Sequence, residues 1–350
     1  MPQGFSIESD SDTGPGSATQ VTVEERVGQS TSFQVRYPVE AIDGDLPVLS
    51  APGLEGGKNL QVICESDGGL ISLVKGPIKG QHVHLQHGPV HGYVDVYGAD
   101  GTSRMDREVQ QERFEATESS VMTTILNRYF DVVTGLGLAP SGGKSPVLIQ
   151  SETDLRFVRK LARRNGRWLH ATSTPEGIER AALREMSLSK DPVAELVINH
   201  QGANLDTLDL YWDIERPTRV VARQLGLEDK KVSRFGHHPG ASLPTGGQQL
   251  ADVAGSRSVS LVTPVAQSAQ LQGRTEALLD EARWFIRARC STTVHRLGRV
   301  LQTHDVVGLK GMGSRHDGLY YVTEVRHIID AMEHRMELEL SRDRWAGGLL

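Results

Sequence analysis

The segment HVHLQHGPVHGY, residues 82–93, holds four histidines and is where metal chemistry would first be sought. Residues two apart on a strand project from the same face, so His82 and His84 would lie side by side. Two imidazoles can bind zinc, but a zinc site needs a third ligand and usually a fourth. His87 and His91 flank a Gly-Pro turn that could fold back toward the pair. No HExxH pattern accompanies them, so the spacing favours a solvated polar strand face.

A second candidate, a nucleotide-binding loop, is also incomplete. The segment GLAPSGGKS ends like a phosphate-binding loop, which requires the pattern G-x-x-x-x-G-K-[ST] so that backbone N–H groups wrap the phosphates. Counting back from Gly143, the first glycine of that pattern should stand where the chain has Leu138, so a flexible turn is the simpler interpretation. The pair His237-His238 lies in a segment rich in Gly and Pro and has no companion ligand.

Nucleophilic and acid–base catalysis lack a recognisable pattern as well. Cys64 and Cys290 are far apart without a CxxC motif, so both are expected to be small buried side chains. No G-x-S-x-G motif is present. Acid pairs such as Glu337 and Glu339 arise by chance among 44 acidic residues, and on a strand they would form its solvent side. We therefore expect a protein that is not an enzyme and has no catalytic residue, cofactor or metal.

The most basic segment, RFVRKLARRNGR, lies in a predicted helix that begins near Thr153 and ends at Asn165-Gly166. Its apolar residues recur at helical spacing, whereas its basic residues lie largely on the opposite face. A solvated helix face is the simplest interpretation, and a docking surface for an acidic protein partner is the alternative. The arginines concerned are Arg156, Arg159, Arg163 and Arg164.

The composition argues against several classes of protein. The chain has 350 residues, 38% of them hydrophobic, and a formal net charge of −6. An acidic chain lacks the basic surface typical of nucleic-acid-binding proteins, so we expect no sequence-specific nucleic-acid binding. No apolar run approaches the ~20 residues that cross a bilayer, and the N-terminus lacks the features of a secretory signal. We expect synthesis in the cytoplasm, no membrane insertion by the chain itself, and two or more packed units.

The first half of the chain changes from strand-like to helical patterns. Residues 1–20 are rich in Gly, Ser and Asp, and we expect a flexible leader. Residues 21–116 contain alternating strand patterns and end in a predicted hairpin with Asp100-Gly101 as its turn. Residues 117–200 contain two amphipathic helices and are expected to form a helix-containing middle region.

The second half returns to strands. Residues 201–231 mix strand-like and helical character, and residues 232–273 have the composition of a polar linker or long loop. Residues 274–350 begin with a predicted helix, RTEALLDEARWFIRARC, and end in two alternating strands, of which MELEL is the clearest. Strands at both ends with helices between them predict an α+β fold.

Two segments resemble a known family. The segment SETDLRFVRKLARRNGRWLHA, residues 151–171, resembles the region of phage tail hub proteins in which a basic helix leads into an aromatic strand. Residues 306–343 resemble their closing pattern, G-[VM]-G-x-R-x-x-G-x-Y-Y-V-T-x-V-x-H, which here includes Arg315, Tyr321 and His327. The family is the phage late control D group of baseplate hub proteins from contractile tails and contractile injection systems, which is related to the hub half of type VI secretion spikes.

The resemblance covers most of residues 20–345 and implies an architecture. Such hubs are trimers whose subunits each carry two tube-like antiparallel β-barrel domains, so that three chains form a ring with pseudo-six-fold symmetry. This ring joins the hexameric inner tube to a trimeric spike, and tube assembly begins on it. Here the first barrel would be residues 21–116, and the second would be residues 274–350 with a contribution from residues 201–231.

The resemblance also implies partners and a location. The expected partners are two further copies in a homotrimer, an inner tail tube protein, a separate trimeric spike protein and baseplate wedge proteins. The chain would be part of an assembled phage tail or contractile injection particle. The basic helix and the closing pattern together supply the expected interface residues, which are Arg156, Arg159, Arg163, Arg164, Arg315, Tyr321 and His327.

Two functions of other classes remain open. A metal-dependent hydrolase would use His82, His84 and a third ligand, and stoichiometric zinc in the purified protein would indicate it. A glycan- or cell-wall-binding module would use the β-rich ends, and would bind carbohydrate as a monomer.

Overall fold

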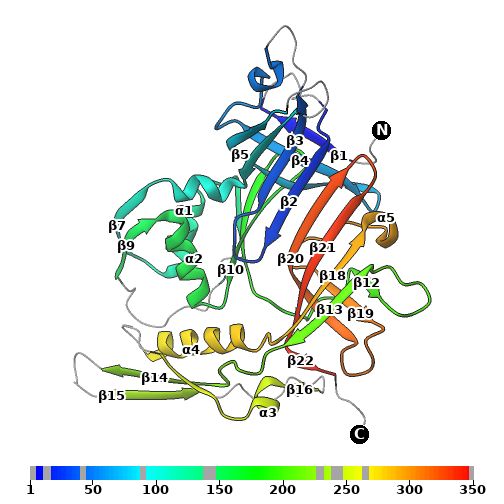
Figure 1. Cartoon of the computed structure of the whole chain (residues 1–350). Helices are drawn as coiled ribbons and strands as arrows, with labels where there is room; N and C mark the ends of the chain where they lie inside the picture. Colours follow the sequence, from blue (N-terminus) through cyan, green and yellow to red (C-terminus); the bar gives the residue numbers. More distant parts are fainter. Residues whose placement is uncertain are drawn as a thin grey trace.

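The structure is a computed structural model, and it describes the following segments: residues 5–10, 17–39, 45–86, 92–135, 137, 147–225, 232–237, 247–261 and 268–346. A long sheet is formed by strands from both ends of the chain, and a helix-containing unit lies at one side of it (Figure 1). No helix in these segments is long and apolar enough to cross a membrane.

Strands dominate the described chain. Those of the first half are β1 (Phe5–Ser9), β2 (Gln20–Arg26), β3 (Ser32–Val39), β4 (Asn59–Ser66), β5 (Gly69–His84), β6 (Gly92–Ala99), β7 (Val109–Glu115), β8 (Val132–Thr134), β9 (Val147–Thr153), β10 (Trp168–Ser173) and β11 (Glu179–Arg184). Those of the second half are β12 (Ala194–Val197), β13 (Thr207–Trp212), β14 (Arg219–Leu225), β15 (Val232–His237), β16 (Gln248–Gln249), β17 (Ser258–Leu261), β18 (Ile286–Thr293), β19 (Val306–Lys310), β20 (Gly318–Asp330), β21 (His334–Arg342) and β22 (Arg344–Trp345).

The helices are short, and several of them lie in the middle of the chain. They are the 3-10 helices η1 (Pro47–Ser50) and η2 (Gly101–Asp106), and the α-helices α1 (Glu118–Leu126), α2 (Asp154–Arg164), α3 (Leu250–Ala254), α4 (Ser268–Ala282) and α5 (Val294–Leu297).

A 12-stranded sheet joins the two ends of the chain. Its strand order is β1-β4-β5-β6-β3-β2-β20-β21-β18-β13, with β19 also paired to β20 and β12 paired to β19. The junction is β2, which is antiparallel both to β3 and to β20, so that Val23 lies opposite Phe33 on one side and His327 on the other. The two barrels expected from the sequence are therefore not two separate closed sheets. The strands of both regions are continuous across β2 and β20, and this sheet is not closed.

The core of this sheet follows the strand period of two. Val21 and Val23 of β2 are fully buried, as are Met336 and Leu340 of β21, while the residues between them face the other side. The two predicted closing strands are confirmed, since β20 and β21 form an antiparallel pair. Strand β2 breaks the pattern at one position, because Glu25 is buried where an apolar residue would be expected.

The helix-containing unit has a core of its own. Helix α2 begins after Thr153, whose hydroxyl accepts a hydrogen bond from the backbone N–H of Arg156, and it ends at Asn165, as predicted. Its apolar face, including Phe157 and Leu161, packs with α1 into a cluster distinct from the core of the large sheet. Strands β10, β11 and β8 form one small sheet of this unit, and β7 and β9 form another.

This unit is fixed against the large sheet by close packing and hydrogen bonds. Gly28, in the turn after β2, lies under the Trp168 ring, where an added Cβ would be 2.5 Å from a ring carbon. From the sheet, the Gln61 amide donates to the carbonyl of Thr174 at 2.8 Å, and Lys75 Nζ donates to the carbonyl of Gly177 at 2.8 Å.

Several segments differ from the sequence prediction. The predicted leader, residues 1–20, includes β1, which pairs with β4 because Phe5 and Ile7 pack on the core. The predicted linker, residues 232–273, contains β15, β16, α3, β17 and the start of α4. Low periodicity concealed these elements because they are short; β15 and β17 both pair with β14, and β16 pairs with β22.

Two predicted boundaries were also wrong. The segment around Asp100 is not a hairpin turn, because the Asp100 carboxylate accepts hydrogen bonds from Thr102 and caps η2. Strand β7 then pairs with β9 and not with β6. The predicted helix that includes Ile286 ends earlier, at Ala282, and Ile286 begins β18. The apolar run that follows Ala282 fits a buried strand as well as it fits a helix.

Candidate functional site: a mixed-charge sheet face

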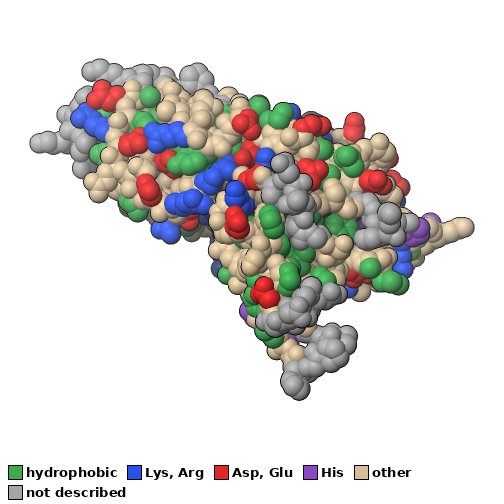
Figure 2. Space-filling view, turned by 90° about the horizontal axis from the view of Figure 1, so that it is seen from above, with side chains coloured by type: hydrophobic (Ala, Val, Ile, Leu, Met, Phe, Trp, Pro, Cys, Tyr) green, Lys and Arg blue, Asp and Glu red, His purple; other side chains and the backbone are tan. Residues whose placement is uncertain are grey.

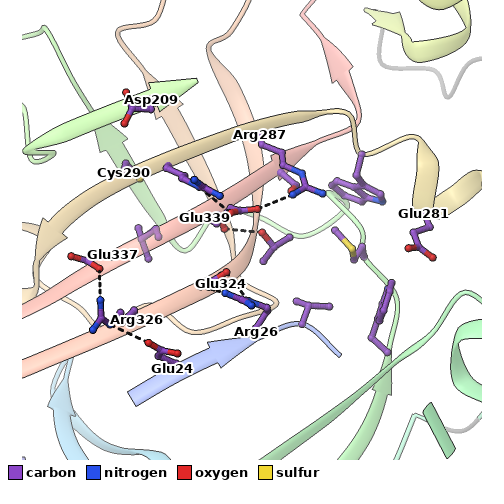
Figure 3. A pocket seen from close by; sticks show the side chains of 18 of the residues that line it. Glu24, Arg26, Asp209, Glu281, Arg287, Cys290, Glu324, Arg326, Glu337 and Glu339 are labelled. Carbon is purple, nitrogen blue, oxygen red and sulfur yellow. Dashed lines mark hydrogen bonds and ion pairs between the residues drawn. The ribbon is translucent and has the colours of Figure 1, made fainter. Parts of the chain in front are cut away.

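A groove of about 1080 Å³ lies over one face of β2, β20, β21, β18 and β13, and the helix-containing unit borders it (Figure 3). Side chains alternate along each strand, so the positions that face the groove are every second residue. Nearly all of these positions are charged or hydroxylated, although the opposite face of the same strands forms the core. The groove is therefore a polar surface supported by a rigid sheet.

The charged side chains form two rows across the strands. One row consists, from β2 to β13, of Glu24, Arg326, Glu337, Ser291 and Thr207. The neighbouring row consists of Arg26, Glu324, Glu339, Arg289 and Asp209. Opposite charges lie directly across adjacent strands at five of the eight neighbouring pairs in these rows, whereas Glu324 and Glu339 are a pair of like charge. Directly opposed charges of opposite sign stabilise a sheet by roughly 0.2–1 kcal/mol each, and directly opposed like charges destabilise it.

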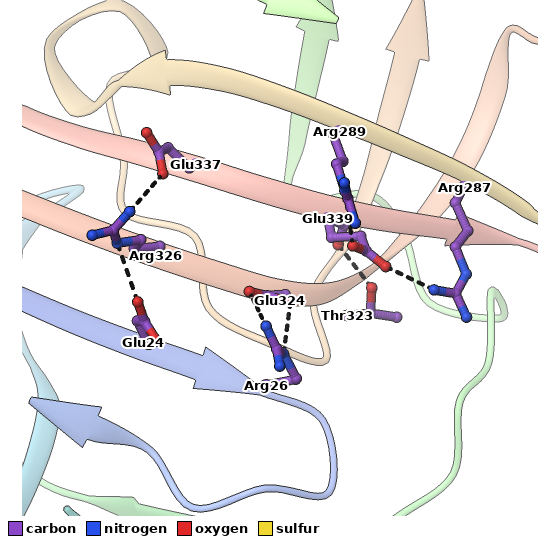
Figure 4. A network of polar contacts seen from close by, with 9 residues as sticks. All are labelled: Glu24, Arg26, Arg287, Arg289, Thr323, Glu324, Arg326, Glu337 and Glu339. Carbon is purple, nitrogen blue, oxygen red and sulfur yellow. Dashed lines mark hydrogen bonds and ion pairs between the residues drawn. The ribbon is translucent and has the colours of Figure 1, made fainter. Parts of the chain in front are cut away.

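The ion pairs on β2 and β20 are well formed (Figure 4). Arg26 donates two hydrogen bonds to the carboxylate of Glu324, at 2.7 and 2.6 Å, and this hydrogen bonding raises the pKa of Arg26 above its ordinary value. Arg326 lies between two acids, with Nε 3.2 Å from Glu24 and Nη1 3.4 Å from Glu337. Each carboxylate in this part of the groove is therefore matched by a guanidinium.

Glu339 is the central acid of the other half of the groove. Its carboxylate lies 3.1 Å from Arg287 and 3.2 Å from Arg289, two residues that project from the same face of β18. The hydrogen bond to Glu339 raises the pKa of Arg289. On the backbone, the Thr323 hydroxyl donates to the carbonyl of Glu339 at 2.9 Å, at the bulge where β20 changes register against β21. One carboxylate is thus shared by two arginines.

The groove has little capacity for covalent chemistry. The thiol of Cys290 lines it but is almost fully buried, and burial raises the pKa of that thiol to about 12, so it stays protonated. The hydroxyl of Ser291 is hydrogen-bonded to that of Thr207 at 2.9 Å, and neither contacts a histidine. What the arrangement can do is make many weak polar contacts, without a net electrostatic field of one sign.

A buried polar cluster lies beneath the groove at the junction of β2, β20 and β21. The carboxylate of Glu25 accepts hydrogen bonds from the backbone N–H and the hydroxyl of Thr303, at 3.1 and 3.2 Å. His327 Nε2 lies 3.7 Å from Glu25, and His327 Nδ1 lies 3.0 Å from His334 Nε2. Burial acts to raise the pKa of Glu25, but His327 and the Thr303 N–H outweigh it and hold that pKa below its ordinary value.

A second group of buried rings continues this cluster toward β10. The rings of His170 and His304 have their centroids 4.3 Å apart, and His304 Nδ1 lies 2.5 Å from the Tyr321 hydroxyl. Burial lowers the pKa of His170 to about 4, that of His304 to about 2 and that of His334 to about 3. These histidines are therefore neutral near pH 7 and serve as packing and hydrogen-bonding groups.

Comparison with known proteins identifies the fold. No protein-family model matches the chain, and no curated protein matches its sequence. A tail protein from Neisseria meningitidis MC58 matches with a TM-score of 0.70 and 18% identity, over 98% of each chain. A 43 kDa tail protein of prophage MuSo2 from Shewanella oneidensis matches with a TM-score of 0.68 and 12% identity, over 97% of this chain and 98% of that one. The chain has the fold of phage tail proteins.

The same fold occurs in a secretion system. A component of the E. coli type VI secretion system, described as structurally similar to the T4 bacteriophage tail proteins gp27 and gp5, matches with a TM-score of 0.60 and 12% identity. The match covers 96% of this chain and 76% of that one. The resemblance found in the sequence is thus confirmed for the tail-protein fold, which the chain shares over almost its whole length.

The histidines that opened the sequence analysis lie on the surface of this fold. His84 stacks on the Tyr93 ring at 4.8 Å between centroids, and His82 Nδ1 lies 4.0 Å from Asp95. His87 and His91 lie outside the described residues. Within the described segments, no group of three or more His, Cys, Asp or Glu side chains could hold a metal ion.

The predicted interface arginines of α2 mostly have partners within the chain. Arg163 makes a two-pronged ion pair with Glu281 of α4, at 2.6 and 2.9 Å. Arg159 is largely buried and donates to the Ser30 hydroxyl at 3.1 Å. The two remaining arginines make longer contacts: Arg156, whose side chain is largely exposed, lies 3.6 Å from Asp106, and Arg164, which is partly buried, lies 4.0 Å from Glu118.

The predicted residues of the closing pattern lie partly on the surface and partly in the interior. Arg315 is exposed and lies over the Trp345 ring at 4.0 Å, so it remains a candidate contact residue. Tyr321 and His327 are buried in the single chain. His327 lies on the core-facing side of β20, whereas Tyr321 precedes the bulge of that strand and packs with Trp284 in a separate small cluster. Their place in the sequence pattern reflects the interior of the fold.

The two rows of charged side chains across the sheet were not predicted from the sequence. The signal was present in TVEER, TEVR and MELEL, where charged residues alternate with apolar ones. Alternation alone shows that each strand has a wet face, but only the register between strands shows that the charges of different strands match.

Proposed function

We propose that the chain is a structural baseplate hub of a contractile tail or contractile injection system, without catalytic activity. The observation that carries this proposal is the agreement of fold with tail proteins over nearly the whole length of both chains. The late control D pattern of residues 306–343 narrows the proposal from tail protein to hub.

In this proposal the hub is a homotrimer. The regions 21–116 and 274–350 supply the two tube-like units of each subunit, and the ring of six units joins a hexameric inner tube to a separate trimeric spike. The large sheet supports this, because β1 and β13 stand at the ends of its strand order and are not paired with each other among the described strands. Free edges at both ends of a sheet allow it to be extended by neighbouring copies.

The mixed charges of the groove agree with the proposed hub role, in which other molecules contact or pass the protein without binding to it tightly. Its acids and bases neutralise one another locally, so a moving polymer of either sign meets no strong field. Figure 2 shows a similar mixture on another face of the molecule, where Lys and Arg side chains gather on the left-hand part with Asp and Glu between them.

The proposal is tested by native mass and electron microscopy of the purified protein, alone and co-expressed with the spike and tube proteins encoded beside it. A species near three times 38.3 kDa that forms rings with a central hole is expected in at least one of these preparations. A chain that stays monomeric in all of them and does not enter tail particles would overturn the hub function. Stoichiometric zinc, or carbohydrate binding by a monomer, would instead support one of the two alternatives from the sequence.

A further inference from the structure

The ribbon formed by β7 and β9 has an unusual pair of edges. These strands pair only with each other among the described elements, and they lie at the margin of the molecule, away from the large sheet (Figure 1). In an antiparallel pair, alternate residues direct their N–H and C=O groups away from the partner strand. Both outer edges of this ribbon therefore present backbone groups that another strand could bind.

The two edges differ in chemistry. On the outward face, β7 presents Arg113 and Glu115, which are more than 60% exposed and form an ion pair at 2.7 Å. On the same face, β9 presents Val147 and Ile149, whose exposed fractions are 51% and 71%. No charged residue occurs in β9 before Glu152, which is paired with Lys160 at 2.6 Å.

Natural proteins usually protect a free strand edge with charges, proline or a bulge, because an apolar edge is a template for pairing with other chains. Strand β7 has that protection and β9 does not. Since this proposal rests on the hub function, we propose that the free edge of β9 binds an extended segment of a neighbouring tail component, which adds to the β7–β9 ribbon as a third strand.

The chemistry of the edge defines that segment. It must be extended, free of charge over a few residues, and apolar at alternate positions, so that its side chains pack beside Val147 and Ile149. A strand of this length contributes far fewer residues than the roughly 20–30 that each partner contributes to a stable interface. The segment must therefore belong to a protein held nearby by other contacts, where its effective concentration is high.

A second copy of this chain is the less suitable occupant. Antiparallel pairing of β9 with β9 of another copy would require a two-fold axis, which a cyclic trimer does not have. Self-association through this edge is one outcome that the experiment must detect.

The experiment is hydrogen exchange of the amides of residues 147–151, in the isolated protein and in tail particles purified from cells that produce it. We expect the outward amides of β9 to exchange at least about tenfold more slowly in the particle, with those of residues 109–115 on the β7 edge unchanged. If the chain enters the particle and the β9 amides still exchange quickly, this inference fails and the hub function stands. If the chain is absent from particles, the hub function fails, and this inference with it.

A pair of variants separates docking from folding. Ile149→Lys adds a charge to the β9 edge at a position that is mostly exposed, and Val109→Lys adds the same charge to β7, where Val109 is 64% exposed. Both variants should fold and melt like the parent. Ile149→Lys should reduce incorporation into particles by at least about fivefold, and Val109→Lys should not. Equal incorporation of the two, or β9 amides already protected by self-association of the isolated protein, would overturn the inference.

Discussion

His327 Nε2 lies 3.7 Å from a carboxylate oxygen of Glu25 in the interior of the sheet, and neither side chain is more than 4% exposed. The two residues belong to adjacent strands, β20 and β2, which join the C-terminal and N-terminal parts of the chain. A buried polar pair at this junction ties the two parts together, because breaking it would leave uncompensated polar groups in a low-dielectric interior.

Replacing Glu25 should therefore destabilise the protein far more than replacing its neighbour. Glu25→Ala leaves the backbone N–H and the hydroxyl of Thr303 without their acceptor and removes the carboxylate that lies 3.7 Å from His327 Nε2. We expect it to lower the free energy of unfolding by about 2–4 kcal/mol. Glu24→Ala removes only an exposed ion pair with Arg326 and should cost less than about 1 kcal/mol. Urea unfolding of the two variants measures the difference, and similar costs would contradict a structural role for Glu25.

The buried histidines predict loss of stability in mild acid. Burial lowers the pKa values of His170, His304 and His334 to about 4, 2 and 3, whereas an unfolded histidine has a pKa near ~6.5. Below that pH the unfolded chain binds protons that the folded chain does not, so stability is complete above pH ~6.5 and falls as the pH decreases. Each histidine contributes a slope of up to about 1.4 kcal/mol per pH unit down to its folded pKa.

The measurement is the free energy of unfolding in urea from pH 7.5 to pH 4.5, for the parent and for His334→Gln. The parent should lose several kcal/mol over this range, and His334→Gln should have a shallower slope by about one proton. Asp100 and Asp305, whose pKa values burial raises, act in the opposite sense at the acidic end. A parent stability that does not change between pH 7 and pH 5 would contradict the prediction.

The close packing of Gly28 against Trp168, where the helix-containing unit contacts the sheet, can be tested by adding a Cβ atom at Gly28. Gly28 and Gly202 both lie in the left-handed region, with φ of 75° and 81°, so alanine is strained at either position. Only Gly28 also has a neighbour in the way, because its added Cβ would lie 2.5 Å from the Trp168 ring, whereas nothing lies within 4 Å at Gly202. Gly28→Ala should cost about 1–3 kcal/mol more than Gly202→Ala in thermal or urea unfolding. Equal costs would mean that the Trp168 ring moves freely.

The sequence predicted what depends on local pattern. The period-two strands β20 and β21 and the caps of α2 were correct because alternation and capping residues are local signals. The pairing of β2 with β20 was not predictable in this way, because its residues lie some 300 positions apart and only the register brings them together. For the same reason the partners of Arg163 and Arg26, which are Glu281 and Glu324, could not be assigned from the sequence.

The ion pair between Arg163 and Glu281 changes how a charge reversal at Arg163 must be interpreted. Charge reversal by Arg163→Glu now places two acids together on α2 and α4, so an effect on assembly would not by itself show docking. The swap Arg163→Glu with Glu281→Arg should restore stability to within about 0.5 kcal/mol, because exposed ion pairs couple by less than ~1 kcal/mol. If Arg163 docks an acidic partner, the swapped protein should be stable and still assemble poorly. Normal assembly of the swapped protein would remove Arg163 from the interface.

Glu339 provides the sharpest test of the mixed-charge face. Its carboxylate is largely buried and contacts both Arg287 and Arg289, so Glu339→Gln removes the acid that these two guanidinium groups share. We expect a loss of about 1–2 kcal/mol in the free energy of unfolding, and new binding of the groove to a polyanion such as heparin at low salt that weakens as salt increases. Glu337→Gln is the comparison variant, because Glu337 is more exposed, Arg326 keeps Glu24 as its partner, and the second arginine that Glu337 contacts, Arg335, is itself 45% exposed. If the two variants lose equal stability and neither binds heparin, the rows of charge do not act as a locally neutralised surface.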